Sequence, residues 1–229
     1  MAQERISRSR KRELEEPDEF ITLSSRIAGF ASAHAKQVIT GFIIVLVMVI
    51  AFSGLRYYSI QTEKKAEIKL EKILMELEKA RENKNPEEVF KALKPEFENM
   101  MVVFPRKKAS KAARLLFAGL AFQAEDSSMA LKLYEQSLKD YEDEPFFKNL
   151  VLKNLANIFE QEKDYAKAIS HLEMILNSQN PEMKDEVLFH LARLHGANNM
   201  KDQEMDDYKK IIAEFPDSEY AKIANTKIQ

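Results

Sequence analysis

Hydrophobic and polar positions divide the chain into two regions with different patterns. Residues 37–55 form an apolar run without a charged side chain, although 31% of all residues are charged. From Ala66 onward, apolar residues instead recur every three or four positions between charged ones, which is the period of an amphipathic helix. No long stretch alternates with a period of two, so we predict an all-α protein.

The apolar run predicts a single N-terminal transmembrane helix over residues 37–58. As a helix, its uncharged part reaches roughly 28 Å, close to the ~30 Å hydrocarbon core of a bilayer. A buried core helix would usually be shorter and would show a polar stripe. Tyr57 and Tyr58 suit an aromatic anchor at the membrane interface.

Residues 1–36 form a charged head whose Lys and Arg residues indicate the orientation of the span. The head holds seven Lys and Arg residues, against five between Arg56 and Met75, so we expect the head in the cytoplasm and the C-terminal domain outside. The basic run in the first twelve residues is either a solvated tail or a contact with anionic lipid. Residues 20–34 have helical spacing, which suits an interfacial helix or an ordinary lead-in. The head is too long for a typical signal peptide, so we favour a retained anchor, although the small residues around Phe52 leave cleavage open.

Residues 59–108 are predicted to form a stalk helix and a degenerate first helical pair. Neither Gly nor Pro occurs between Gly54 and Pro86, so the membrane helix is expected to continue until Asn85 and Pro86 start a new helix. We expect that helix to end near Pro95. A further amphipathic helix is expected from Phe97 to Phe104.

Residues 109–216 contain three similar units, each with two helical stretches. The best unit begins at Leu152, and the next follows 36 residues later at Leu188. In the third unit Glu204 stands where a small residue would let the helices approach, so we expect looser packing there. A short closing helix is predicted over residues 217–229. The apolar and small positions of the best unit are Leu152, Leu155, Ala156 and Phe159 on its first helix and Ala168, Leu172, Ile175 and Leu176 on its second.

Composition argues against several functional classes. The net charge of −2 gives no electrostatic reason to expect nucleic acid. The absence of cysteine excludes disulfides, thiolate metal sites and cysteine nucleophiles. The four histidines are scattered outside any metal-binding motif, and no Gly-rich phosphate loop is present. We therefore predict a protein that is not an enzyme, with no catalytic residues, cofactor, metal site or small-molecule substrate.

The pattern of residues 109–216 resembles the tetratricopeptide repeat, whose period is 34 residues. The resemblance implies an α-solenoid of helical hairpins that binds proteins in a concave groove. A narrower resemblance, carried by the head, the span, the exit Arg56-Tyr57-Tyr58, the long charged helix and the closing helix, is to the YfgM-like family. That resemblance implies a single-pass bacterial inner-membrane protein with periplasmic repeats. Its implied partners are Sec translocon subunits, periplasmic chaperones and secreted polypeptides.

The first helices of the repeats supply the candidate groove residues. Lys153 and Asn157 resemble half of a clamp for a peptide carboxylate, or are simply solvated. The apolar candidates instead favour an extended, partly apolar polypeptide. A scaffold for cell-envelope or outer-membrane assembly and a cytoplasmic-facing membrane adaptor remain alternative functions. The full candidate set is Leu116, Leu120, Lys153, Asn157, Glu160, Phe189 and Arg193.

Overall fold

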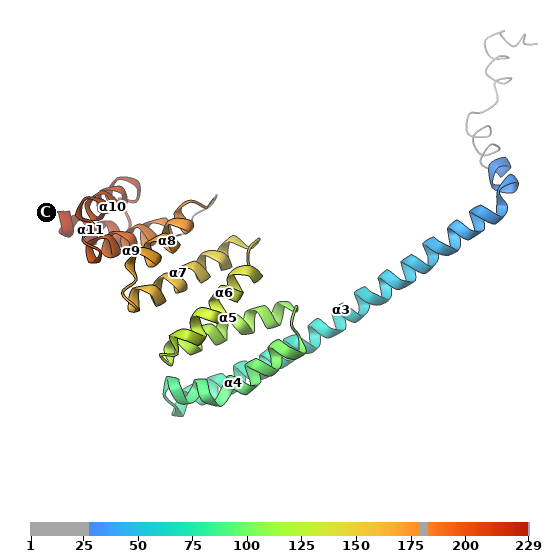
Figure 1. Ribbon diagram of the computed structural model, residues 1–229, viewed down its shortest axis with the longest axis horizontal. Coiled ribbons are helices and arrows are strands. Elements are labelled where there is room, and N and C mark those ends of the chain that lie inside the picture. The colour runs from blue at the N-terminus through green and yellow to red at the C-terminus, as the bar shows by residue number, and fades with distance from the viewer. Residues whose placement is uncertain (1–27, 179–182, 229) are drawn as a thin grey trace, which may run out of the picture. The chain divides into compact units, whose positions relative to one another are not determined.

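The computed structural model describes residues 28–178 and 183–228, and its regular structure there is helical throughout. The prediction of an all-α protein is confirmed. Figure 1 shows the helices in chain order. Their bounds are α3 Ala35–Asn83, α4 Pro86–Val103, α5 Lys108–Gln123, α6 Ser127–Asp140, α7 Pro145–Gln161, α8 Tyr165–Leu176, α9 Lys184–Ala197, α10 Lys201–Glu214 and α11 Glu219–Ile228.

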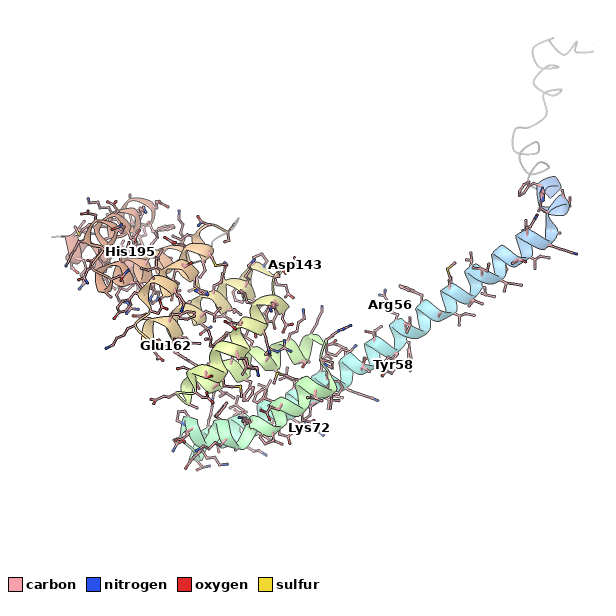
Figure 2. The ribbon with its side chains drawn as sticks, viewed as in Figure 1. Arg56, Tyr58, Lys72, Asp143, Glu162 and His195 are labelled. Carbon is pink, nitrogen blue, oxygen red and sulfur yellow. The ribbon has the colours of Figure 1, made fainter. Side chains whose placement is uncertain are left out.

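The chain divides into two compact units, residues 1–60 and residues 61–229. Helix α3, which begins in the first unit and ends in the second, is long and apolar enough to cross a membrane. Its apolar side chains point outward around the helix (Figure 2), and Phe42, Phe52 and Leu55 are 69%, 67% and 71% exposed. Of the predicted interfacial segment, residues 28–33 are helical. Residues 1–27, including the basic run, lie outside the described part of the chain.

Helix α4 corrects one sequence expectation. It begins as predicted, with Asn85 as N-cap and a capping box formed with Glu88, but it continues through Pro95 instead of ending there. Proline removes one backbone donor and costs about 3 kcal/mol inside a helix. The buried side chains of Leu93 and Phe97, on either side of Pro95, belong to one hydrophobic cluster, and their burial offsets that cost.

Three hairpins, α5–α6, α7–α8 and α9–α10, turn in the same way. Glu125, Lys163 and Asn199 have φ near 60°, and the next residue in each turn donates its N–H to a carbonyl five positions earlier, at 2.8–2.9 Å. This is the hydrogen bond of a Schellman motif, which ends a helix tightly. The repeat seen in the sequence is therefore also a repeat of turn geometry.

The third hairpin accommodates Glu204 by a means that the sequence prediction missed. A Cβ atom added to Gly196 would lie 2.7 Å from the Glu204 carboxylate. Glycine therefore provides the space that the small residue of the repeat pattern would otherwise leave. His195 Nδ1 lies 2.7 Å from Asp207 Oδ2, and both residues are buried. The helices α9 and α10 are thus joined by a polar contact as well as by apolar packing.

The core follows the solenoid as successive apolar clusters within residues 61–228. One cluster joins the second part of α3 to α4, α5, α6 and α7. Another joins α7, α8 and α9, and a further one joins α9, α10 and α11. Each hairpin therefore buries its apolar face against its neighbours, as expected of repeats that are not stable alone.

Candidate functional site

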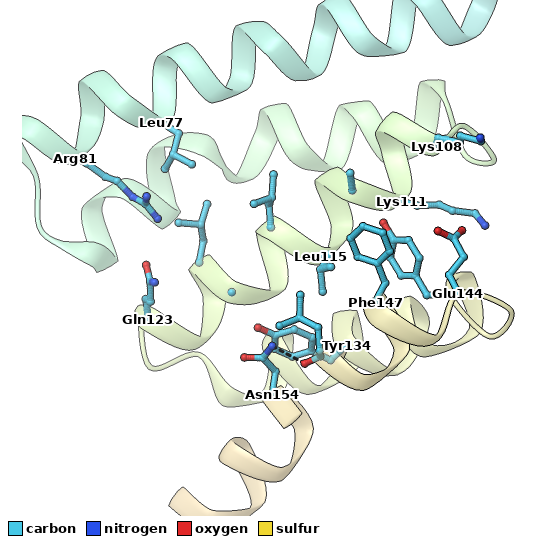
Figure 3. Close-up of a pocket in the computed structure, with 16 residues that line it drawn as sticks. Leu77, Arg81, Lys108, Lys111, Leu115, Gln123, Tyr134, Glu144, Phe147 and Asn154 are labelled. Atoms are coloured by element: carbon cyan, nitrogen blue, oxygen red, sulfur yellow. Dashed lines mark hydrogen bonds between the residues drawn. The ribbon is translucent and has the colours of Figure 1, made fainter. Parts of the chain in front are cut away.

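A cavity of about 720 Å³ lies along α5, and we call it the apolar trough. Its floor is α5, one wall is the end of α3, and the other wall is the first half of α7. Figure 3 shows Leu77 and Arg81 of α3 on one side, with Phe147 and Asn154 of α7 on the other. The volume lies within the usual range of ligand pockets, about 300–1,000 Å³.

The floor of the trough combines small and apolar residues of α5. Leu116 is 39% exposed and Leu120 is 4% exposed, and both line the cavity. Between them, a Cβ atom added to Gly119 would meet, outside the adjoining residues and backbone of its own helix, the Tyr134 hydroxyl oxygen at 3.6 Å. The floor is therefore open at Gly119. Two residues that the sequence placed in a groove, Leu116 and Leu120, lie together here.

The α7 wall carries aromatic residues that the sequence analysis did not identify. Phe147 stacks on Tyr141 with ring centroids 4.8 Å apart, and Phe146 meets Phe147 edge-on at 5.3 Å. Phe146, Phe147 and Leu150 are 57%, 37% and 39% exposed. Phe147 and Leu150 line the trough, whereas Phe146 lines a smaller cavity beside Glu186 and Val187. A signal was present, since Leu150 lies three residues before the candidate Lys153 and Phe147 lies three residues before Leu150.

Cationic side chains line the rim of the trough. Lys108 and Lys111 lie toward the start of α5, and Arg81 lies toward its end, beside Gln123 (Figure 3). Lys111 Nζ donates to the backbone carbonyl oxygen of Asp140 at 2.7 Å. Among the described residues, Arg81 and Lys108 form no ion pair. Among the described residues that line the trough, Glu144 is the one that carries a carboxylate.

The tyrosine hydroxyls of the trough are neutral at physiological pH. Burial raises the pKa of Tyr134 to about 12. Burial, aided by the charge of Glu144, also raises the pKa of Tyr141. Both groups are therefore uncharged and can donate or accept a hydrogen bond. The electrostatic character of the trough comes from its rim, not from these hydroxyls.

Between α7 and α9 the groove has a different character, and we call it the ion-paired face. Lys153 Nζ lies 2.6 Å from Glu186 Oε1. The Arg193 guanidinium binds both oxygens of Glu160, at 2.5 and 2.8 Å. These pairs join the two helices, and three of the predicted groove residues, Lys153, Glu160 and Arg193, take part in them.

The remaining predicted residues lie apart from the trough. Asn157 lines a shallow hollow together with Glu160 and Phe122. Phe189 packs beside Tyr220, with ring centroids 5.1 Å apart. The predicted set is thus divided among the trough, the ion-paired face and an aromatic contact with α11.

His190 sits within the ion-paired face. Its Nε2 lies 3.7 Å from Glu186 Oε1, and its Nδ1 lies 3.4 Å from Arg193 Nη2. Burial, and then the positive charge of Arg193, lower the pKa of His190 below its ordinary value of 6.5. In the described part of the chain, no three His, Asp or Glu side chains gather in a way that would hold a metal ion.

The chain matches two known families of protein domains. The family described as "Tetratricopeptide repeat-like domain" matches residues 29–187, and that described as "Tetratricopeptide repeat" matches residues 186–218. No curated protein sequence is significantly similar to this chain.

Two solved structures match part of this chain, and the first of them is similar in fold. A tetratricopeptide repeat protein from Parabacteroides merdae is 16% identical with a TM-score of 0.56, over 69% of this chain and 57% of that one. This chain therefore matches little more than half the length of that protein. BtubC from P. vanneervenii is 15% identical with a TM-score of 0.43, over 67% of this chain and 74% of that one.

Proposed function

This chain belongs to the family of tetratricopeptide repeat-like domains, and we propose that it is a single-pass membrane scaffold whose repeats bind polypeptides in the bacterial periplasm. The two family matches confirm the superfamily that the sequence predicted. Repeats of this superfamily indicate protein–protein interaction. The YfgM-like assignment, the periplasmic location and the Sec translocon as partner are the finer parts of the proposal. Their support is the order of segments along the chain and the count of basic residues around the span.

The observation that carries the binding role is the apolar trough. Large apolar side chains that remain partly exposed in a concave surface favour contact with another molecule. Leu116, Phe147 and Leu150 are such side chains, each between 37% and 39% exposed. A partner that covers them removes apolar area from water, at about 25 cal/mol per Å².

Site-specific cross-linking in membranes tests the identity of the partner. A photoreactive phenylalanine analogue at Leu116 should capture Sec channel subunits, chaperones or secreted chains. The same analogue at Met174, which is 48% exposed on α8 and does not line the trough, is the matched control. Capture of outer-membrane or envelope assembly factors alone would contradict the translocon role and support the alternative scaffold.

Topology requires a separate measurement. Alkaline phosphatase fused after Gln229 should be active, because the enzyme is active outside the cytoplasm. A fluorescent protein that requires the cytoplasm to mature should be dark at the same site. The reverse pair of results would make the repeats a cytoplasmic-facing adaptor and overturn the periplasmic assignment.

A further inference from the structure

The dimensions of the apolar trough suit one particular kind of polypeptide. From Lys108 to Gln123, α5 advances about 22 Å along its axis, at 1.5 Å per residue. The trough lies above α5, between α3 and α7. A single helix is ~10–12 Å across with its side chains, and about four turns of it would match the length of α5.

The chemistry of the lining distinguishes a helix from an extended chain. An extended peptide needs partners for its backbone N–H and C=O groups, because unpaired buried groups are costly. Most of the surface of the trough is apolar, with Leu115, Leu116 and Leu150 among its lining residues, and the Asn154 side chain already donates to the Leu150 carbonyl oxygen at 2.8 Å. A helix pairs its own backbone groups and needs only an apolar surface for its apolar stripe.

The charge at the rim specifies the ends of that helix. Lys108 and Lys111 stand at one end of the trough and Arg81 at the other, with Glu144 as the one carboxylate among the described residues of the lining. Cations at both ends favour carboxylates on the bound segment and oppose lysine or arginine there. An apolar surface with cations at both ends is complementary to a segment that is apolar in its middle and acidic near its ends.

We propose that the trough binds an amphipathic α-helix of a partner polypeptide, apolar along one stripe and acidic near both ends. This inference rests on the proposed polypeptide-binding function and replaces its extended ligand by a helical one. About four turns of helix match the length of α5. Apolar residues at every third or fourth position would lie on the floor, and the open site at Gly119 would receive one of the larger side chains.

Three synthetic peptides test the helix and the charges separately. The first is a 16-residue fluorescent peptide with leucines on one helical stripe and glutamates at both ends. The second carries lysines in place of those glutamates, and the third carries two central prolines that prevent a helix. Binding to the full chain in phosphatidylcholine nanodiscs is measured by fluorescence anisotropy, with empty nanodiscs as background.

We expect the first peptide to bind at least about tenfold more tightly than the other two. Equal binding of the proline peptide would overturn the helix while leaving polypeptide binding at the trough intact. Equal binding of the lysine peptide would overturn the acidic ends. Binding of none of the three would overturn the inference, and the cross-links from Leu116 would then decide separately whether the proposed function survives.

Substitutions in the trough locate the binding and test its chemistry. Gly119→Leu should fill the floor of the trough and lower the affinity for the first peptide about tenfold. Leu116→Lys, at an exposed position, should lower that affinity by a similar factor without crowding Tyr134. The double variant Arg81→Glu/Lys108→Glu should reverse the preference between the first two peptides. Lys132→Glu, at an exposed position on α6 outside the trough, should change neither affinity.

A second copy of the chain is the competing occupant. Sedimentation of the full chain in detergent, with and without Gly119→Leu, separates the two cases. A monomer both with and without Gly119→Leu supports a foreign helix as the ligand. A dimer that dissociates on Gly119→Leu would overturn the proposal and assign the trough to self-association.

Discussion

The apolar trough and the ion-paired face are neighbouring parts of one groove with different surfaces. In the trough, Leu116, Phe147 and Leu150 remain partly exposed. Between α7 and α9, by contrast, Lys153 pairs with Glu186 and Glu160 pairs with Arg193. A ligand on the ion-paired face would have to displace existing charge pairs, whereas a ligand in the trough covers unpartnered apolar surface. This difference is why we propose that binding is concentrated at the N-terminal end of the groove.

The largest effect on stability is expected from a contrast between two adjacent residues of α5. Phe117 is 1% exposed and stacks on Phe97 with ring centroids 5.0 Å apart, so Phe117→Ala should lower the free energy of unfolding by about 3–5 kcal/mol. Leu116 faces the trough, and Leu116→Ala should change it by about 0.5 kcal/mol or less. Chemical denaturation of the full chain in detergent, followed by circular dichroism, measures both.

The variant with the smaller effect on stability should have the clear effect on ligand binding. Leu116→Ala should lower the affinity for the acidic helical peptide, although the fold is intact. A loss of stability for Leu116→Ala close to that for Phe117→Ala would show that the trough is part of the core. The contrast between a packed face and a binding face of α5 would then fail.

The next test concerns the two ion pairs. Glu186 has a 12% exposed side chain, so Lys153→Met leaves a largely buried carboxylate without its lysine and should cost about 1–2 kcal/mol of unfolding free energy. The Arg193 side chain is 46% exposed, and Arg193→Met should cost about 0.5 kcal/mol or less. Denaturation of both variants measures the difference, and Glu186→Gln combined with Lys153→Met should recover part of the larger loss. Equal losses for the two single variants would show that burial does not separate these pairs.

Much of the fold was predictable because each element has a local cause in the sequence. The apolar run identified α3, Asn85 and Pro86 identified the start of α4, and the repeat pattern identified the hairpins. Pro95 misled the prediction because its local cost was visible, whereas the burial of Phe97 and its neighbours depends on distant helices. Likewise, Glu204 looked unfavourable because its partner, Gly196, lies on the other helix of the hairpin.

The site was less predictable than the fold. Periodicity placed Leu116 and Leu120 on the first helix of a repeat, and both line the trough. The pairing of Glu160 with Arg193 joins residues 33 positions apart, and nothing in either helix alone specifies it. The contribution of α3 to the trough, through Leu77 and Arg81, was also absent from the sequence analysis, since that helix precedes the recognisable repeats.

Two glycines provide a smaller test. Gly119→Ala should raise the free energy of unfolding by about 0.5–1 kcal/mol, because alanine loses less backbone entropy in a helix and its Cβ would make an ordinary contact with the Tyr134 hydroxyl at 3.6 Å. Gly196→Ala should gain less, because its Cβ would displace the Glu204 carboxylate. Thermal denaturation compares the two variants. A larger gain at Gly196 would show that Glu204 moves freely and does not depend on the glycine.

The smallest expected effect is the pH dependence caused by His190 in the ion-paired face. Because burial and Arg193 lower the pKa of His190 in the folded state, the unfolded chain binds the proton more readily. The free energy of unfolding should therefore fall as the pH drops through about 6.5, and the full penalty is reached only below the folded pKa.

His190→Gln removes the titrating group, so its stability should decline less than that of the unmodified chain between pH 7 and pH 5. In Arg193→Met the decline should be intermediate, because burial still lowers the pKa of His190 while the neighbouring cation is gone. Denaturation midpoints at several pH values measure these slopes. A steeper decline for His190→Gln would mean that protonated His190 is stabilised by Glu186 more than it is opposed by burial, and the ion-paired face would then tighten in acid instead of loosening.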